Sequence, residues 1–267
     1  MLFGDSLVVI RGGGDLASGV TYKLHAAGFP AIVLELDQPL AIRRTVAFAS
    51  AVADGKSTIE GVEAVRVDAP GDAVPIAQSG TVAVLVSPTI PKLSVSPAVV
   101  VDARMAKRNL DTSIDQAPLV VALGPGFTAG LDCHAVVETM RGHRLGRVIW
   151  EGSAAPDTGV PGTVGSASSE RIVRAPMAGP VGWNVAIGDL VDEGQTVGRV
   201  GTADVVAPLD GVVRGLITPG FSVDVGMKIG DIDPRADRTA CFEVSDKSRL
   251  VGGGVLEAVL TWLNRTA

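Results

Sequence analysis

Residues 7–35 read LVVIRGGGDLASGVTYKLHAAGFPAIVLE, and this stretch decides the expected fold class. The apolar run Leu7–Ile10 predicts a buried strand, and a helical segment follows it from Leu16 to Ala27. A second apolar run at 31–35 predicts another strand. A strand, glycine turn, helix and strand in succession are typical of parallel pairing, so we expect a parallel sheet covered on both faces.

Further strands of this sheet are expected at Val82–Val86, Ala98–Asp102 and Leu119–Leu123, which are uninterrupted apolar runs. Ile42–Ala53 predicts a helix, and Thr58–Val67 predicts a hairpin that turns at Glu60-Gly61. The expected fold class of the first half is therefore α/β, with a Rossmann-like, doubly wound parallel sheet.

An internal repeat follows residue 170. A constant offset of 32 places Ala175-Pro176 on Ala207-Pro208 and Gly188 on Gly220. Neither half is large enough to bury its apolar face alone, so we expect the two to interlock into one small sandwich. The glycine and valine pattern resembles the biotinyl/lipoyl-type barrel-sandwich hybrid. The hairpin at 201–204 has no acceptor lysine, so we expect no covalent lipoate or biotin.

These patterns predict four segments. Residues 1–130 form a Rossmann-like domain that binds a nucleotide or phosphate, and 131–170 form a β-rich connection. Residues 171–235 form the barrel-sandwich repeat, and 236–267 form a C-terminal helical segment. Its apolar stretch at 250–263 has helical spacing, but three consecutive glycines obscure where the helix begins.

Composition excludes several classes of protein. The formal net charge is −6, and no basic run is long enough for a phosphate-backbone footprint, so we expect no nucleic-acid partner. The two cysteines form no disulfide framework, which favours a cytoplasmic location. The longest uncharged run, 73–91, contains prolines and a glycine, so we expect no membrane span. With only three histidines, we expect no metal site.

The motif Gly12-x-Gly14-x-x-Ala17 lies between a predicted strand and a predicted helix, where a dinucleotide fingerprint is found. Glycines allow the backbone to approach a pyrophosphate, and the helix N-terminus favours its charge. Glu35 closes the second strand and is a candidate to accept hydrogen bonds from a ribose diol, with Asp37 as a second candidate.

A structural interpretation of the same motif stays open. Gly12, Gly13 and Gly14 are also what a close turn from strand to helix requires, with Asp15 as the N-cap of the helix. A carboxylate at Asp15 would compete with a phosphate for the same N–H donors. All four residues remain candidates for ligand binding.

Polar residues follow two other predicted strands. Asp102, Arg104, Lys107 and Arg108 follow the strand Ala98–Val101, where open α/β sheets bind ligands, although a solvated loop is an equal alternative. Arg43-Arg44 follows the second strand and is either near the same ligand or, as we favour, on the ordinary surface.

Gly124 and Gly126 repeat the arrangement of glycines after a strand and predict a second loop over the same crevice, unless they form a plain turn. Cys133 and His134 are an adjacent thiol and imidazole, which makes them candidate reactive residues. A buried, unreactive cysteine is the favoured interpretation there.

Several unusual motifs occur in a fixed order along nearly the whole chain. They are VIRGGGDLASGV (9–20), LELDQPLAIRRTVAF (34–48), VDARMAKRN (101–109), GPGFTAGLDCHAVVET (124–139), RGHRLGRVIWEG (141–152) and DTGVPG (157–162). In this combination the sequence resembles the selenium-dependent molybdenum hydroxylase maturation proteins of the YqeB type.

The resemblance implies an accessory protein that acts on the apo-enzyme of a molybdenum hydroxylase of the xanthine dehydrogenase kind. It assigns no catalytic residue, and whether the protein is an enzyme stays open. A phosphate-bearing small molecule, of dinucleotide or molybdopterin type, fits the predicted glycine loops. Two alternatives are an NAD-dependent oxidoreductase, supported by Gly12, Gly14 and Glu35, and a non-catalytic module that docks a partner through the repeat.

Overall fold

The structure is a computed structural model that describes residues 1–159 and 169–266. The last residues of the DTGVPG motif, and residues 160–168 of the predicted connection, lie outside the described part. The chain divides into two compact units. The first comprises Met1–Pro39, Ala47–Asp157 and Val244–Ala267, and the second comprises Leu40–Val46 and Thr158–Glu243.

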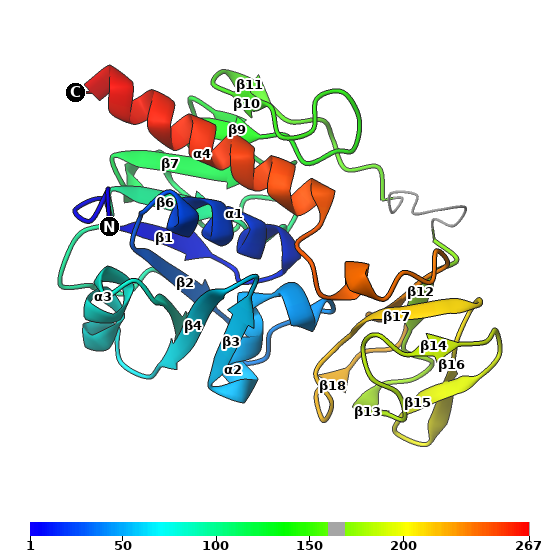
Figure 1. Ribbon diagram of the computed structural model, residues 1–267. Helices are drawn as coiled ribbons and strands as arrows, with labels where there is room; N and C mark the ends of the chain where they lie inside the picture. Colours follow the sequence, from blue (N-terminus) through cyan, green and yellow to red (C-terminus); the bar gives the residue numbers. More distant parts are fainter. Residues whose placement is uncertain (160–168, 267) are drawn as a thin grey trace. The chain divides into compact units, whose positions relative to one another are not determined.

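The first unit is built on a nine-stranded sheet of order β10-β9-β7-β6-β1-β2-β5-β4-β3 (Figure 1). Its inner strands pair in parallel: β1 Val8–Arg11, β2 Ala31–Glu35, β4 Val62–Val67, β5 Val82–Val86, β6 Val99–Asp102, β7 Leu119–Leu123 and β9 Ala135–Val137. The two edge strands, β3 Lys56–Ile59 and β10 Val148–Ile149, are antiparallel to their neighbours. A separate two-stranded antiparallel sheet is formed by β8 Thr128–Ala129 and β11 Gly152–Ser153.

The predicted fold class is wrong. The sheet is mixed and not the Rossmann-like, doubly wound parallel sheet that we expected, because hairpins add an antiparallel strand at each edge. The turn at Glu60-Gly61 joins β3 to β4, and a two-residue connection allows only antiparallel pairing. The barrel-sandwich prediction is corrected as well, since the second unit contains two separate four-stranded antiparallel sheets.

Helices cover both faces of the large sheet. The helices α1 Asp15–Ala26 and α4 Asp246–Thr266 share one apolar core with alternate strand residues, whereas α3 Pro70–Gln78 packs in the core of the opposite face. The segment predicted as one helix at 42–53 contains instead η1 Arg44–Val46, η2 Phe48–Ser50 and the single-turn helix α2 Ala51–Asp54. In the described part of the chain, no helix is long and apolar enough to cross a membrane.

The three glycines of α4 lie inside the helix and do not end it. A Cβ added at Gly252 would lie 2.4 Å from the carbonyl oxygen of Gly19 in α1, and one added at Gly254 would lie 2.1 Å from the carbonyl oxygen of Gly146. Gly253 points to open space, with no described atom within 4 Å. Two of the three glycines are therefore required by close packing, and the helix begins at Asp246 rather than near Leu250.

The second unit contains the 32-residue repeat as paired sets of strands. Its sheets have the orders β12-β19-β17-β14 and β16-β15-β13-β18, so each sheet takes two strands from each half of the repeat. One apolar core packs between the sheets. The strands are β12 Ile172–Arg174, β13 Gly179–Trp183, β14 Leu190–Val191, β15 Thr196–Val200, β16 Ala203–Val206, β17 Gly211–Leu216, β18 Ser222–Val223 and β19 Lys228–Asp233.

Residues 40–46 join the second unit, although they follow β2 directly in the sequence. The Leu216 N–H donates to the Ile42 carbonyl oxygen at 2.9 Å, and Arg44 Nε donates to the Leu216 carbonyl oxygen at 2.7 Å. Arg43 is buried and donates to the carbonyl oxygens of Ala240 and Glu243 in the turn around η4 Thr239–Cys241. Arg43 and Arg44 were predicted either to bind the ligand or to lie on the ordinary surface. Instead, both bind backbone carbonyl oxygens of the second unit.

Substitutions in α4 can distinguish a glycine required by close packing, Gly252, from one that faces open space, Gly253. Gly252→Ala should lower the free energy of unfolding by about 1–3 kcal/mol, because its methyl group pushes α1 and α4 apart. Gly253→Ala should raise it by up to about 1 kcal/mol, because alanine is the better helix former. Chemical denaturation of both variants measures the difference. Equal effects of the two substitutions would show that the helices do not approach at Gly19 and Gly252.

Candidate functional site

Loops that follow three strands meet at the carboxyl ends of the parallel strands, which we call the carboxyl edge. A Cβ at Gly12 would lie 3.2 Å from the Ala103 carbonyl oxygen, and one at Gly126 would lie 2.6 Å from the Arg108 backbone. A Cβ at Gly124 would meet Thr139 Oγ1 at 2.4 Å. The structure thus brings together the predicted loops after β1, β6 and β7, and adds the loop after β9.

The glycine turn after β1 is held by its own surroundings. Gly12 has a φ of +97°, and its N–H donates to the Leu34 carbonyl oxygen at 2.7 Å. The Gly13 N–H donates to Glu35 Oε1 at 2.8 Å, and a Cβ at Gly13 would lie 2.9 Å from the Ala49 nitrogen. Close packing therefore explains the first two glycines without a ligand.

Glu35 holds the glycine turn in place. Its Oε2 accepts the N–H of Leu36 at 2.7 Å, so both carboxylate oxygens bind backbone N–H groups. Burial raises the pKa of Glu35, and these two hydrogen bonds oppose the rise. The predicted ribose acceptor is thus already engaged, while Asp37 is exposed.

Gly14 differs from the two glycines before it. It is the N-cap of α1, with a φ of −70°, and a Cβ added there would meet no described atom within 4 Å. Asp15, predicted as a possible N-cap, instead lies in the first turn of α1 and accepts a hydrogen bond from Ser248 Oγ at 2.6 Å. Ala17 is buried in the core beneath the helix. No packing contact or backbone strain among the described residues requires glycine at position 14.

An ionic network joins the ends of β1 and β6. Arg11 is only 2% exposed and donates to Asp111 Oδ2 at 2.7 Å and to Thr112 Oγ1 at 3.2 Å. Arg104 binds Asp102 Oδ2 at 2.6 Å and Asp111 Oδ1 at 2.7 Å. The Thr112 hydroxyl donates to Asp102 Oδ2 at 2.5 Å. Two guanidinium groups and two carboxylates thus neutralise one another, and the predicted cation Arg104 is committed to this network.

The segment after Arg104 has an unusual backbone. Met105 and Lys107 have φ values of 56° and 63°, in the left-handed region that side chains with a Cβ rarely adopt. Lys107 Nζ forms an ion pair with Asp157 Oδ2 at 2.7 Å. Arg108 is exposed, and the described residues provide it with no hydrogen bond or ion pair. Of the predicted cations in this loop, Arg108 alone is therefore uncommitted within the described part of the chain.

Lys247 is a cation near the carboxyl edge that the sequence did not indicate. It lies in the first turn of α4, half-buried, and among the described residues it has no hydrogen bond or ion pair. Burial, followed by the nearby charge of Arg141, lowers its pKa, while Asp15 and Glu138 oppose this change. The sequence prediction missed it because the helix start was placed near Leu250.

Cys133 and His134 are packed into the sheet. Burial raises the pKa of the Cys133 thiol to about 12, and the charge of Asp132 adds to the rise. The thiol is therefore protonated near neutral pH. His134 Nδ1 accepts the Val120 N–H at 3.0 Å, and burial lowers the pKa of its imidazole. In the described residues, no three His, Cys, Asp or Glu side chains gather as metal ligands.

Comparison with curated proteins confirms the predicted similarity to YqeB. The chain is 50% identical over 263 residues to the Escherichia coli (strain K12) protein named "Uncharacterized protein YqeB". The match covers 98% of this chain and 49% of that protein, so the chain spans about half the length of its curated relative. No protein-family model matches the sequence.

Two solved structures show distant likenesses to this chain. A succinylglutamate desuccinylase/aspartoacylase from Rhodobacter sphaeroides is 17% identical, with 85% of each chain covered and a TM-score of 0.27. An aspartoacylase family protein from Mesorhizobium loti is 11% identical, with 86% of this chain and 85% of that chain covered and a TM-score of 0.28. Scores this low carry no argument about the activity of this protein.

The ionic network predicts a pH-dependent stability. Asp111→Ala should lower the free energy of unfolding by about 1–2 kcal/mol at pH 7, because buried Arg11 loses an acceptor while the half-exposed carboxylate is partly solvated. Hydrogen bonding from Arg11 holds the pKa of Asp111 below its ordinary 3.8. The stabilisation is thus fully present above pH 3.8 and is lost as the pH falls through the lower, folded-state pKa.

Urea denaturation between pH 7 and pH 2.5 measures this difference, with Asp115→Ala in the same loop as the control. The control should change the free energy of unfolding by no more than about 0.5 kcal/mol at any pH. A destabilisation by Asp111→Ala that stays constant down to the lowest pH would contradict the ion pair with Arg11.

Thiol labelling tests the environment of Cys133. With a thiol pKa of about 12, folded protein at pH 8 should react with a thiol reagent at least roughly a hundredfold more slowly than urea-unfolded protein. Cys241 is also buried, with a raised pKa, and should behave in the same way. Mass spectrometry of tryptic peptides locates the label, and rapid labelling of Cys133 in folded protein would refute the assignment.

Proposed function

We propose that this protein is an accessory factor in the maturation of a selenium-dependent molybdenum hydroxylase of the xanthine dehydrogenase kind. In this proposal it holds a phosphate-bearing small molecule, of dinucleotide or molybdopterin type, at the carboxyl edge beside β1. The ordered motifs support the maturation role, and they include the glycine turn, the loop after β6 and the loop after β7.

The observation that carries the binding proposal is the open start of α1. Gly14 has no described atom near an added Cβ, and no described side chain caps the helix there. The first N–H groups of a helix have no partner within the helix, and the helix dipole favours negative charge at this end. A phosphate fits both properties, whereas Gly12 and Gly13 need no ligand to explain them.

Lys247 supports the same proposal, as the uncommitted cation near this helix start. Its neighbour in the sequence, Ser248, donates a hydrogen bond to Asp15 in the first turn of α1 at 2.6 Å, and the charge of Asp15 opposes the lowering of the Lys247 pKa by burial. Asp15 is held by Ser248, which reduces its competition for the N–H donors of the helix. The NAD-dependent alternative is weaker, because its ribose acceptor Glu35 already binds two backbone N–H groups.

Replacement of Gly14 in the natural host tests the proposal. Gly14→Val should leave the protein folded, since its φ of −70° suits any residue, but the branched side chain occupies the space where a phosphate approaches the helix. Hydroxylase activity should be lost while the hydroxylase apo-enzyme remains present. Activity assays and immunoblotting of the hydroxylase measure the two quantities.

Gly71→Val is the matched control, because Gly71 lies in the first turn of α3 and is likewise open. It should support normal hydroxylase activity. Deletion of the gene should reproduce the Gly14→Val result, and normal hydroxylase activity in the deletion strain would refute the maturation role. Normal hydroxylase activity with Gly14→Val, together with loss of activity in the deletion strain, would show that the start of α1 is not part of the binding site.

A further inference from the structure

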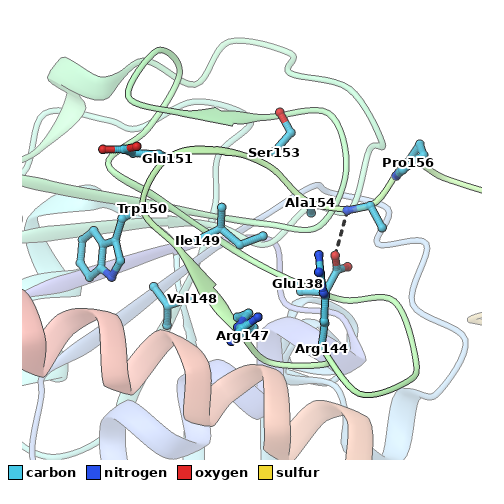
Figure 2. Close-up of a pocket in the computed structure, with 11 residues that line it drawn as sticks. Glu138, Arg144, Arg147, Val148, Ile149, Trp150, Glu151, Ser153, Ala154 and Pro156 are labelled. Atoms are coloured by element: carbon cyan, nitrogen blue, oxygen red, sulfur yellow. Dashed lines mark hydrogen bonds between the residues drawn. The ribbon is translucent and has the colours of Figure 1, made fainter.

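A cavity of about 600 Å³ lies at the end of β9, outside the glycine turn. Figure 2 shows its lining, which comes from Glu138, Arg144, Arg147, strand β10, Trp150, Glu151 and residues 153–156. Its volume falls within the range of small-molecule sites. All of these residues belong to the first unit.

Glu138 holds two segments of the cavity lining together. Its side chain is 3% exposed, and the carboxylate accepts the N–H groups of Met140 at 2.7 Å and Ala155 at 2.8 Å. The Glu138–Ala155 bond appears as a dashed line in Figure 2. These bonds tie the loop after β9 to the segment that follows β11, and they satisfy the buried carboxylate without a cation.

Two arginine side chains in the lining have no hydrogen-bonding partner among the described residues. Arg144 and Arg147 are exposed, lie in one turn linked by an Arg147 N–H bond to the Arg144 carbonyl oxygen at 2.9 Å, and have no side-chain hydrogen bond or ion pair in the described structure. Two guanidinium groups balance the charge of one dianion and match the oxygen geometry of a phosphate.

The remaining lining is largely apolar. Ile149 and Ala154 pack with the core on one face of the sheet, and Pro156 lies beyond them in the lining. Trp150 also lines the cavity, and Arg265 stacks over its ring at 4.7 Å, which limits the motion of the ring. Such a wall favours a flat apolar body, and Glu151 in the same lining is an acceptor for a ring amino group.

We infer that this cavity binds a phosphate monoester carried on an aromatic ring, with the phosphate between Arg144 and Arg147 and the ring against Ile149 and Ala154. The site stands on side chains that the proposed phosphate site at Gly14 does not use. It therefore holds or fails independently of that proposal.

Isothermal titration calorimetry in chloride buffer tests both parts of the ligand. Phenyl phosphate should bind at least about tenfold more tightly than either inorganic phosphate or phenol, because only phenyl phosphate uses both the arginines and the apolar wall. Arg144→Ala combined with Arg147→Ala should weaken phenyl phosphate at least about tenfold. Both arginines are exposed, so the double variant should keep the thermal stability of the parent.

Arg199→Ala is the control for loss of an exposed arginine outside the cavity, since Arg199 belongs to the second unit. It should bind phenyl phosphate as the parent does. Absence of binding to the parent, equal affinity for inorganic phosphate, or unchanged affinity in the double arginine variant would overturn the inference. If Gly14→Val lost binding of phenyl phosphate while the double arginine variant kept it, the binding site would be the start of α1, and the inference would be overturned.

Discussion

The close approach of α1 and α4 is the constraint on which the first unit depends. At Gly19 and Gly252 the helices are so near that a methyl group on either glycine would lie 2.4 Å from a carbonyl oxygen of the other helix. With no side chain between them, the first turn of α4 reaches Asp15 through Ser248. The last helix of the chain thereby contributes Lys247 to an edge otherwise built by the loops after the strands.

Ion pairing decides which cations near this edge are available to a ligand. Arg11 and Arg104 are neutralised by Asp102 and Asp111, and this network fixes the loop after β6 against the end of β1. A buried guanidinium that lost these partners would be costly, so the network is a structural element of the sheet. In the described part of the chain, uncommitted cations lie at Arg108 after β6, at Arg144 and Arg147 after β9, and at Lys247 in the first turn of α4.

Sequence reasoning located the strands better than their pairing. The apolar runs at 82–86 and 119–123 became strands with those bounds, because burial on both faces leaves a clear pattern. The hairpin that turns at Glu60-Gly61 was expected, but its place at the edge of this sheet was not, since β3 is short and largely polar. The loops expected after the strands do meet at the carboxyl edge, but Arg11 and Asp111 are 100 residues apart, and no local pattern in the sequence indicates such a partner.

The division of the chain has a consequence for synthesis on the ribosome. The first unit takes its residues from three separate stretches, the last of which begins at Val244. Until that stretch has emerged, the apolar side of α1, with Val20 and Leu24, lacks the helix that buries it. The second unit, by contrast, has its final residue at Glu243. The unit that contains the N-terminus is therefore the later of the two to complete its core, the reverse of the usual order in a chain of successive domains.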